Sequence, residues 1–168
     1  MRLTGTQALR ATVLTVVALI VLRLICAAVT PLTFDEAYYW TWSKHLAGGY
    51  YDHPPMVAIV IRLGTMIAGD TEFGVRLISV LLALPMSFAV YRATLLFDNP
   101  RAAATATLLL NVMLMIAAGT VIVTPDAPLM VASSFVLLCL AEVIVTGRGA
   151  WWLAVGTAVG AALVSKYT

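Results

Sequence analysis

Long apolar runs, separated by short polar turns, occupy most of this 168-residue chain. A helix needs roughly 20 apolar residues to cross a hydrocarbon layer about 30 Å thick. Five segments are predicted to be membrane-spanning helices: 11–30, 74–97, 101–123, 127–146 and 150–165. The pattern therefore predicts an all-α polytopic membrane protein.

The first run also has features of a secretory signal, because Arg2 and Arg10 precede it and small residues follow it. Its length and the internal Arg23 favour a retained membrane anchor instead.

A sixth apolar segment, 54–69, is short and has Arg62 at its middle. A charge at the centre of a span costs about 2.5–3.5 kcal/mol. Helical spacing places Ala58, Arg62 and Thr65 on one stripe and larger apolar side chains elsewhere, as in a helix that lies in the membrane interface.

The distribution of basic residues supports that interpretation. If 54–69 does not cross the membrane, one side collects Arg2, Arg10, Arg92, Arg101 and Arg148. The positive-inside rule makes that side cytoplasmic. We therefore expect residues 31–73 to form one extracytoplasmic loop with juxtamembrane helices, and any chemistry to lie on that face.

Composition agrees with a membrane protein: 62% of residues are hydrophobic, 11% are charged and the mean hydropathy is +0.99. A net charge of +2 argues against nucleic-acid binding. Cys26 and Cys139 lack the spacing of a metal site. No internal repeat or flexible linker separates a second domain, so residues 1–168 are expected to be one membrane domain.

The loop contains two candidate motifs. Thr33 and Glu36 have the spacing of a capping box, which predicts a short helix that Gly48 and Gly49 would end. The acidic pair formed by Asp35 and Glu36 lies at the outer end of the first span, where carboxylates are candidates for function. For Glu36 the cap is a competing structural explanation.

The second motif is Tyr50-Tyr51-Asp52-His53-Pro54-Pro55. The two prolines restrict the backbone, so Asp52 and His53 should be held on a stiff turn. Asp52 could equally cap the following helix, and His53 could be an ordinary loop residue. The many aromatic residues around both motifs are typical of an interfacial belt.

These residues resemble family 39 glycosyltransferases, which include protein O-mannosyltransferases, the lipid A aminoarabinose transferase and rhizobial galacturonic acid transferases. The resemblance rests on five segments in order: Phe34–Trp40, Tyr50–Pro55, Phe73–Arg76, Thr124–Pro128 and Ser165–Tyr167. It extends from about residue 8 to the last residue. Members of the family are several hundred residues long, so the chain resembles only their N-terminal part, a C-type glycosyltransferase membrane module.

The resemblance implies transfer of a sugar from a polyprenyl-phosphate carrier to a lipid, glycan or protein acceptor. Asp35 matches the family's catalytic Asp, and Asp126 matches a second acidic position, with Glu36 as a further catalytic candidate. The leaving phosphate needs cationic donors, and the candidates for binding it or the sugar are His53, Asp52, Arg76 and Lys166. The aminoarabinose transferases carry Lys where this chain has His53. The structural alternatives are that Arg76 anchors a span, Lys166 snorkels and Asp126 caps a helix.

Asp35, Glu36, Asp52 and His53 could also hold a divalent cation, although no spacing demands one. Two other functions remain open: a transporter or flippase subunit, whose buried charges line a path for a polar head group, and a noncatalytic membrane fragment. The expected location is the bacterial inner membrane, with the site on its extracytoplasmic face.

Overall fold

The computed structural model describes residues 4–167, so Arg2 lies outside the described part. Nine helices form there: α1 (Gly5–Val29), α2 (Phe34–Lys44), α3 (Met56–Ala68), α4 (Glu72–Leu81), α5 (Ala83–Phe97), α6 (Pro100–Val112), α7 (Leu114–Gly119), α8 (Asp126–Thr146) and α9 (Trp151–Leu163). No strand occurs among these residues, which confirms the prediction of an all-α protein.

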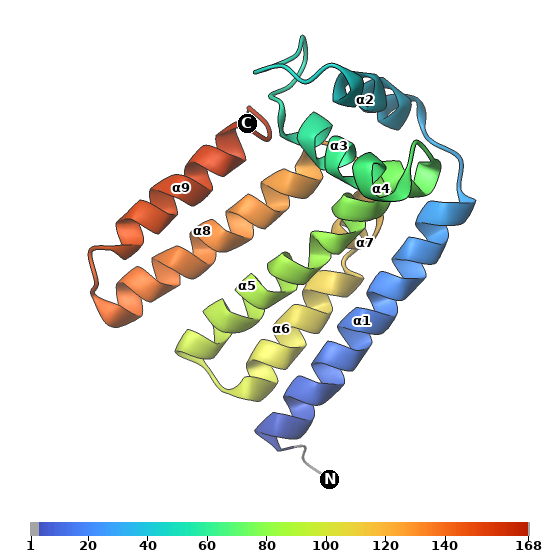
Figure 1. Ribbon diagram of the computed structural model, residues 1–168. Coiled ribbons are helices and arrows are strands. Elements are labelled where there is room, and N and C mark those ends of the chain that lie inside the picture. The colour runs from blue at the N-terminus through green and yellow to red at the C-terminus, as the bar shows by residue number, and fades with distance from the viewer. Residues whose placement is uncertain (1–3, 168) are drawn as a thin grey trace.

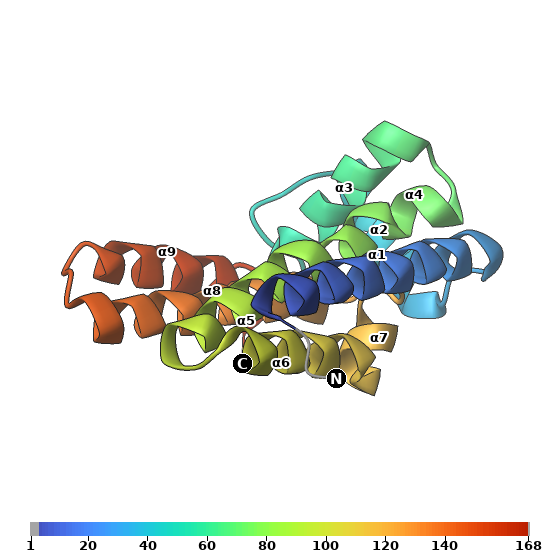
Figure 2. The ribbon, with the colours of Figure 1, turned by 90° about the horizontal axis from the view of Figure 1, so that it is seen from below.

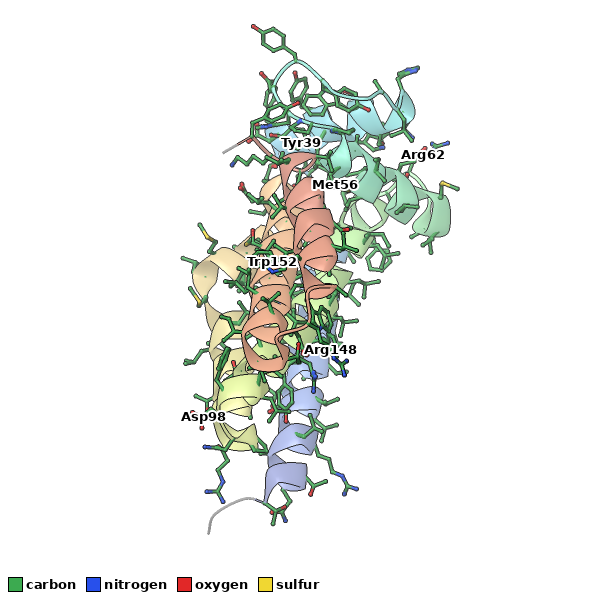
Figure 3. The ribbon with its side chains drawn as sticks, turned by 90° about the vertical axis from the view of Figure 1, so that its left-hand side faces the viewer. Tyr39, Met56, Arg62, Asp98, Arg148 and Trp152 are labelled. Carbon is green, nitrogen blue, oxygen red and sulfur yellow. The ribbon has the colours of Figure 1, made fainter. Side chains whose placement is uncertain are left out.

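Three helical segments of the described chain are long and apolar enough to cross a membrane: Gly5–Val29, Glu72–Phe97 and Asp126–Thr146. They run side by side, and the α5–α6 and α8–α9 turns lie toward the same end as the N-terminus (Figure 1). The helices α2 and α3 lie at the opposite end, close to the C-terminus (Figure 1). Tyr39 lies at that end, whereas Asp98 lies toward the other (Figure 3).

The segment 54–69 forms α3, which has 13 residues and is too short to span a bilayer. It lies across the long helices and projects from their row in the view of Figure 2. This arrangement suits an interfacial helix, and its position on a membrane surface stays a prediction. The capping box that begins α2 is confirmed, although α2 ends at Lys44, four residues before Gly48.

The apolar run 101–123 forms two helices rather than the single helix that we predicted. The chain becomes extended at Met113, between α6 and α7. The guanidinium of Arg23 in α1 lies against this break, with Nη2 2.6 Å from the carbonyl oxygen of Asn111 and Nη1 3.3 Å from its side-chain oxygen. Arg23 therefore occupies a carbonyl that a continuous helix would need, and this buried charge has a structural partner.

The other predicted spans also differ in detail. The run 74–97 is confirmed as one long apolar helical segment, Glu72–Phe97, in which α4 passes into α5 at Leu82, shortly before Pro85, a residue that cannot donate a helical hydrogen bond. The run 150–165 forms α9, which has only 13 residues. Long hydropathy windows locate these helices but miss their interruptions.

The turn between α3 and α4 depends on two glycines. A β-carbon added to Gly74 would overlap the backbone carbonyl oxygen of Gly69, and Gly69 itself has φ 77°. We expect Gly74→Ala to lower the free energy of unfolding in detergent by about 3 kcal/mol, since the backbone must move to relieve the overlap.

The matched control is Gly156→Ala in α9, where an added β-carbon meets no other atom within 4 Å. This variant should unfold at or slightly above the wild-type temperature, because Ala favours a helix. Equal thermal stability of the two variants would contradict the close approach at Gly74.

Candidate functional site

Four segments far apart in the sequence meet at the end of the bundle that carries α2. The amide of Val123, in the turn before α8, donates to Oε1 of Glu36 at 3.0 Å. The amide of Met56, at the start of α3, donates to the carbonyl oxygen of Val164, just after α9, at 3.2 Å. These contacts bring the loop 31–73 against the start of α8 and the end of α9, which lie at the same end of the bundle (Figure 1).

Tyr39 lies near three of the acidic residues that the sequence predicted. Its side chain is 8% exposed, and its pKa is raised, first by burial and then by the negative charges of Asp35, Asp52 and Asp126. The charges of these three carboxylates, which come from separate segments, therefore all act on one tyrosine. The Tyr39 hydroxyl makes no hydrogen bond to another described residue.

Asp35 is exposed on the first turn of α2, one helical turn before Tyr39. Sequence reasoning assigned Tyr39 to an aromatic belt and missed it as a site residue. Its spacing of four residues from Asp35 was the available signal, since that spacing places both on one helix face.

Asp52 is held in the site by a second tyrosine. The Tyr38 hydroxyl donates to Oδ2 of Asp52 at 2.9 Å. This hydrogen bond, followed by desolvation and the charge of Asp52, raises the pKa of Tyr38, so the phenol stays protonated and keeps donating. Asp52 is exposed, so one face of its carboxylate stays open to solvent.

His53 is half-buried among aromatic rings. Its imidazole lies edge-on to Tyr39 and Trp42, with ring centres 6.0 and 6.5 Å apart. Trp42 stacks on Tyr50 at 4.4 Å, and the single hydroxyl proton of Tyr50 is shared between the backbone carbonyl oxygens of Trp42 and His45, each 3.1 Å away. These contacts and the buried Pro54 pack the turn against α2, and its stiffness stays a prediction.

Lys166 and Asp126 form an ion pair across the α8–α9 hairpin. The Nζ of Lys166 lies 2.8 Å from Oδ1 of Asp126, and both side chains are partly exposed. Asp126 is the first residue of α8, so its charge also complements the helix dipole. A cationic group thus lies within reach of the acidic cluster around Tyr39.

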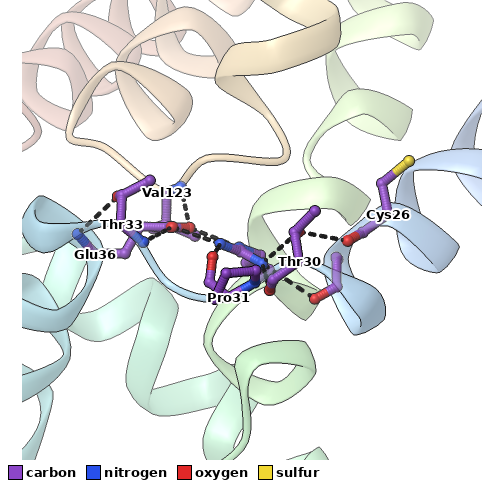
Figure 4. A network of polar contacts seen from close by, with 8 residues as sticks. Cys26, Thr30, Pro31, Thr33, Glu36 and Val123 are labelled. Atoms are coloured by element: carbon purple, nitrogen blue, oxygen red, sulfur yellow. Dashed lines mark hydrogen bonds and ion pairs between the residues drawn. The ribbon is translucent and has the colours of Figure 1, made fainter.

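Glu36 and Arg76 form a separate, buried ion pair (Figure 4). They are 0% and 1% exposed. Nε and Nη2 of Arg76 donate to Oε1 and Oε2 of Glu36 at 2.7 and 2.6 Å. The remaining Arg76 hydrogen bonds go to the end of α1 and the residues after it: Ala27, Thr30 and Pro31.

Glu36 is satisfied as completely as Arg76. It also accepts hydrogen bonds from the backbone amides of Thr33 and Val123. Burial is the largest single influence on its pKa and raises it, but the hydrogen bonds and the charge of Arg76 together hold that pKa below its usual range. Neither side chain has a free face, so the predicted catalytic role of Glu36 and phosphate-binding role of Arg76 do not fit this geometry. Both side chains instead join α1, α2, α4 and the turn before α8.

The predicted set of cation ligands does not come together. Within residues 4–167, no three His, Cys, Asp or Glu side chains are grouped so that they could hold a metal ion. Glu36 is turned toward Arg76, away from the exposed Asp35. The remaining candidates, Asp52 and His53, are adjacent in sequence but have different neighbours.

Comparisons with known proteins identify glycosyltransferases that are similar to this chain. Over 72 residues the chain is 36% identical to the lipid A galacturonosyltransferase RgtD of Rhizobium johnstonii (strain DSM 114642 / LMG 32736 / 3841). The matched part covers 42% of this chain and 15% of that relative, so the chain corresponds to a small part of its length. No solved structure matches. The model of the dolichyl-phosphate-mannose-protein mannosyltransferase family matches residues 52–168, which is more than half of the chain and includes five of the seven predicted site residues. The chain therefore belongs to the dolichyl-phosphate-mannose-protein mannosyltransferase family.

Proposed function

We propose that this chain forms part of a membrane glycosyltransferase that moves a sugar from a polyprenyl-phosphate carrier to a lipid, glycan or protein acceptor. The family and the three long apolar helices make it an integral membrane protein. The observation that carries the proposal is that Lys166 pairs with Asp126 and that the charges of Asp126, Asp35 and Asp52, from three separate segments, all act on Tyr39.

The chemistry gives each group a role. An acceptor hydroxyl attacks the anomeric carbon of the sugar, so a new carbon–oxygen bond forms as the bond to the phosphate oxygen breaks. The transition state has oxocarbenium character, and a carboxylate must take the hydroxyl proton. Asp35 takes this proton, because it is exposed and makes no hydrogen bond with another described residue.

When the bond between the anomeric carbon and the phosphate oxygen breaks, the polyprenyl phosphate leaves with the bonding electrons and gains negative charge. Lys166 stabilises this charge, and the imidazole of His53 donates a hydrogen bond to the phosphate. Asp126 holds the Lys166 ammonium until the phosphate arrives. The Tyr39 hydroxyl donates a hydrogen bond to a sugar or phosphate oxygen. Because its raised pKa keeps the phenol neutral, Tyr39 does not repel the phosphate as the nearby carboxylates do.

The site is proposed to face the extracytoplasmic side of a bacterial inner membrane. In a variant lacking Cys26 and Cys139, single cysteines at Gly48 and at Asp70 should react with an impermeant maleimide added from outside. A cysteine at Asp98, at the opposite end of the bundle (Figure 3), should be protected. Protection at 70 with labelling at 98 would reverse the proposed orientation.

The test of the proposed activity is release of polyprenyl phosphate. Full-length protein in detergent is incubated with a radiolabelled polyprenyl-phosphate sugar and membrane extract as acceptor. The proposal expects labelled product and free polyprenyl phosphate in equal amounts. A transporter or flippase subunit would move the donor across vesicles without releasing the phosphate, and a noncatalytic fragment would do neither.

Replacing Tyr39 by Phe tests the residue that the structure adds to the site. The ring packing against Trp42 and His53 should survive, while the hydroxyl is lost. We expect turnover to fall about tenfold, the usual scale for one neutral hydrogen bond to a reacting group. Tyr51→Phe is the control, because Tyr51 is 98% exposed and should retain wild-type turnover. Equal rates in both variants would remove Tyr39 from the site.

A further inference from the structure

A buried cation lies inside the bundle, away from the acidic residues near Tyr39. Arg23 belongs to α1, which is long and apolar enough to span a membrane, and its side chain is 5% exposed. Ionisable side chains within membrane-spanning helices are costly and usually have a function. The chemistry proposed above gives Arg23 no role.

The partner of Arg23 is the break between α6 and α7 rather than a carboxylate. Its guanidinium donates to the backbone carbonyl oxygen and to the side-chain oxygen of Asn111. The Asn111 side chain in turn donates to Oγ of Ser87 at 2.8 Å and to the carbonyl oxygen of Thr107 at 3.0 Å. Asn111 is 1% exposed, so these contacts fix the end of α6 against α1 and α5.

A second contact holds the other end of the same segment. The amide of Val123 donates to Glu36, whose ion pair is in turn bonded to the end of α1 (Figure 4). The helix α7 lies between Asn111 and Val123. Asp126 follows shortly after, begins α8 and holds the ammonium of Lys166. The position of the break therefore contributes to the position of Asp126.

We propose that Arg23 is a positioning residue, which occupies the Asn111 carbonyl, keeps α6 from continuing and so places Asp126 in the site. The inference rests on the proposed function, because it concerns the geometry of the same site. In a continuous helix the amide of Met115 would donate to that carbonyl. A residue that changes from extended to helical conformation shortens the chain by about 2 Å. A displacement of about 1 Å at reacting groups can lower a rate about 10²-fold.

A proline at position 114 would keep the break without the help of Arg23. Leu114 is the first residue of α7 and is 81% exposed, and Met113 before it has φ −60° and ψ 131°. Proline is favoured at the first position of a helix and after a residue in that extended conformation. It cannot donate to the carbonyl of Leu110, and its ring would clash with that carbonyl in a continuous helix.

The kinetic test measures polyprenyl phosphate release by full-length protein in detergent. Arg23→Met removes the charge and should lower turnover about tenfold or more. Leu114→Pro alone should keep the wild-type rate, and the double variant should recover most of it. Recovery by the proline distinguishes positioning from a general contribution to stability. Wild-type turnover in Arg23→Met, or no recovery in the double variant, would overturn the inference.

The control on the same helix is Arg10→Met. Arg10 is exposed near the opposite end of α1, so its loss should leave turnover unchanged. An equal fall in turnover in Arg10→Met and Arg23→Met would trace the effect to loss of positive charge on α1 and overturn the role of the break.

A spectroscopic measurement tests the positioning without requiring activity. In a variant lacking Cys26 and Cys139, nitroxide labels are attached to cysteines at positions 29 and 122, where Val29 and Ile122 are 74% and 40% exposed. The labels report the distance between the end of α1 and the turn before α8. Arg23→Met should shift or broaden the distribution of distances, and the added proline should restore it. An unchanged distribution in Arg23→Met would overturn the inference.

These measurements separate failure of the inference from failure of the proposed function. If the wild-type protein transfers no sugar, the proposed function is wrong and the label distances alone decide the role of Arg23. If Arg23→Met does not fold, the double variant with Leu114→Pro decides. A folded double variant with the wild-type distribution supports the inference, and an unfolded or displaced one overturns it.

Discussion

Asp35→Asn is expected to lower turnover by on the order of 10² or more while membrane insertion and donor KM stay at wild-type values. Asn has the size of Asp but cannot take a proton from the acceptor hydroxyl. Asp35 is exposed and makes no hydrogen bond with another described side chain, so its replacement should leave the fold intact. The measurement is the initial rate of polyprenyl phosphate release by full-length protein.

Asp98→Asn provides the matched control, because Asp98 is exposed at the opposite end of the bundle (Figure 3). It should retain the wild-type rate. If Asp35→Asn also retains that rate, the proton acceptor is another carboxylate near Tyr39, and Asp126→Asn and Asp52→Asn become the next variants to measure.

Arg76→Leu is expected to lower the free energy of unfolding by about 3–5 kcal/mol, the usual cost of removing one partner from a buried ion pair. The change leaves the Glu36 carboxylate at 0% exposure without its cation. It also leaves carbonyl oxygens of Ala27, Thr30 and Pro31 without their donor. Thermal or denaturant unfolding in detergent measures the effect.

The control for this prediction is Arg62→Leu in α3. Arg62 is exposed, so its loss should change stability by less than about 0.5 kcal/mol. Arg76→Lys should recover only part of the loss, because an ammonium cannot reproduce the two parallel hydrogen bonds that the guanidinium donates to Glu36. Wild-type stability in Arg76→Leu would show that the pair does not join these helices.

The same pair predicts a pH dependence. The folded-state pKa of Glu36 lies below its unfolded value, so its contribution is fully present above the ordinary Glu pKa of about 4.3. The contribution is lost as pH falls through the lower folded pKa. Wild-type protein should therefore lose more stability than Glu36→Gln between pH 5 and the acid limit of the assay. Parallel curves for the two proteins would contradict the shift.

Local patterns were sufficient for much of this fold. The apolar runs located the membrane helices, and the three-residue spacing of Thr33 and Glu36 identified the start of α2. The short run with Arg62 at its middle predicted a helix that does not span, which α3 matches in length. These features were predictable because hydropathy and capping act between residues close together in the sequence.

The roles of individual charges depended on partners far away in the sequence. The buried pair of Glu36 and Arg76 spans 40 residues, and the contact from Glu36 to the Val123 amide spans 87. The break after α6 likewise involves Arg23, 88 residues before Asn111. No local pattern encodes such contacts.

The sequence by itself thus determined an all-α membrane protein, its approximate helices and a set of charged candidates on two motifs. Only the tertiary structure decided which candidates are buried against each other, as Glu36 and Arg76 are, and which remain exposed near Tyr39, as Asp35 and Asp52 do. The physical reason is that hydropathy and capping depend on neighbours along the chain, whereas the burial and charge partners of a side chain depend on how the helices pack.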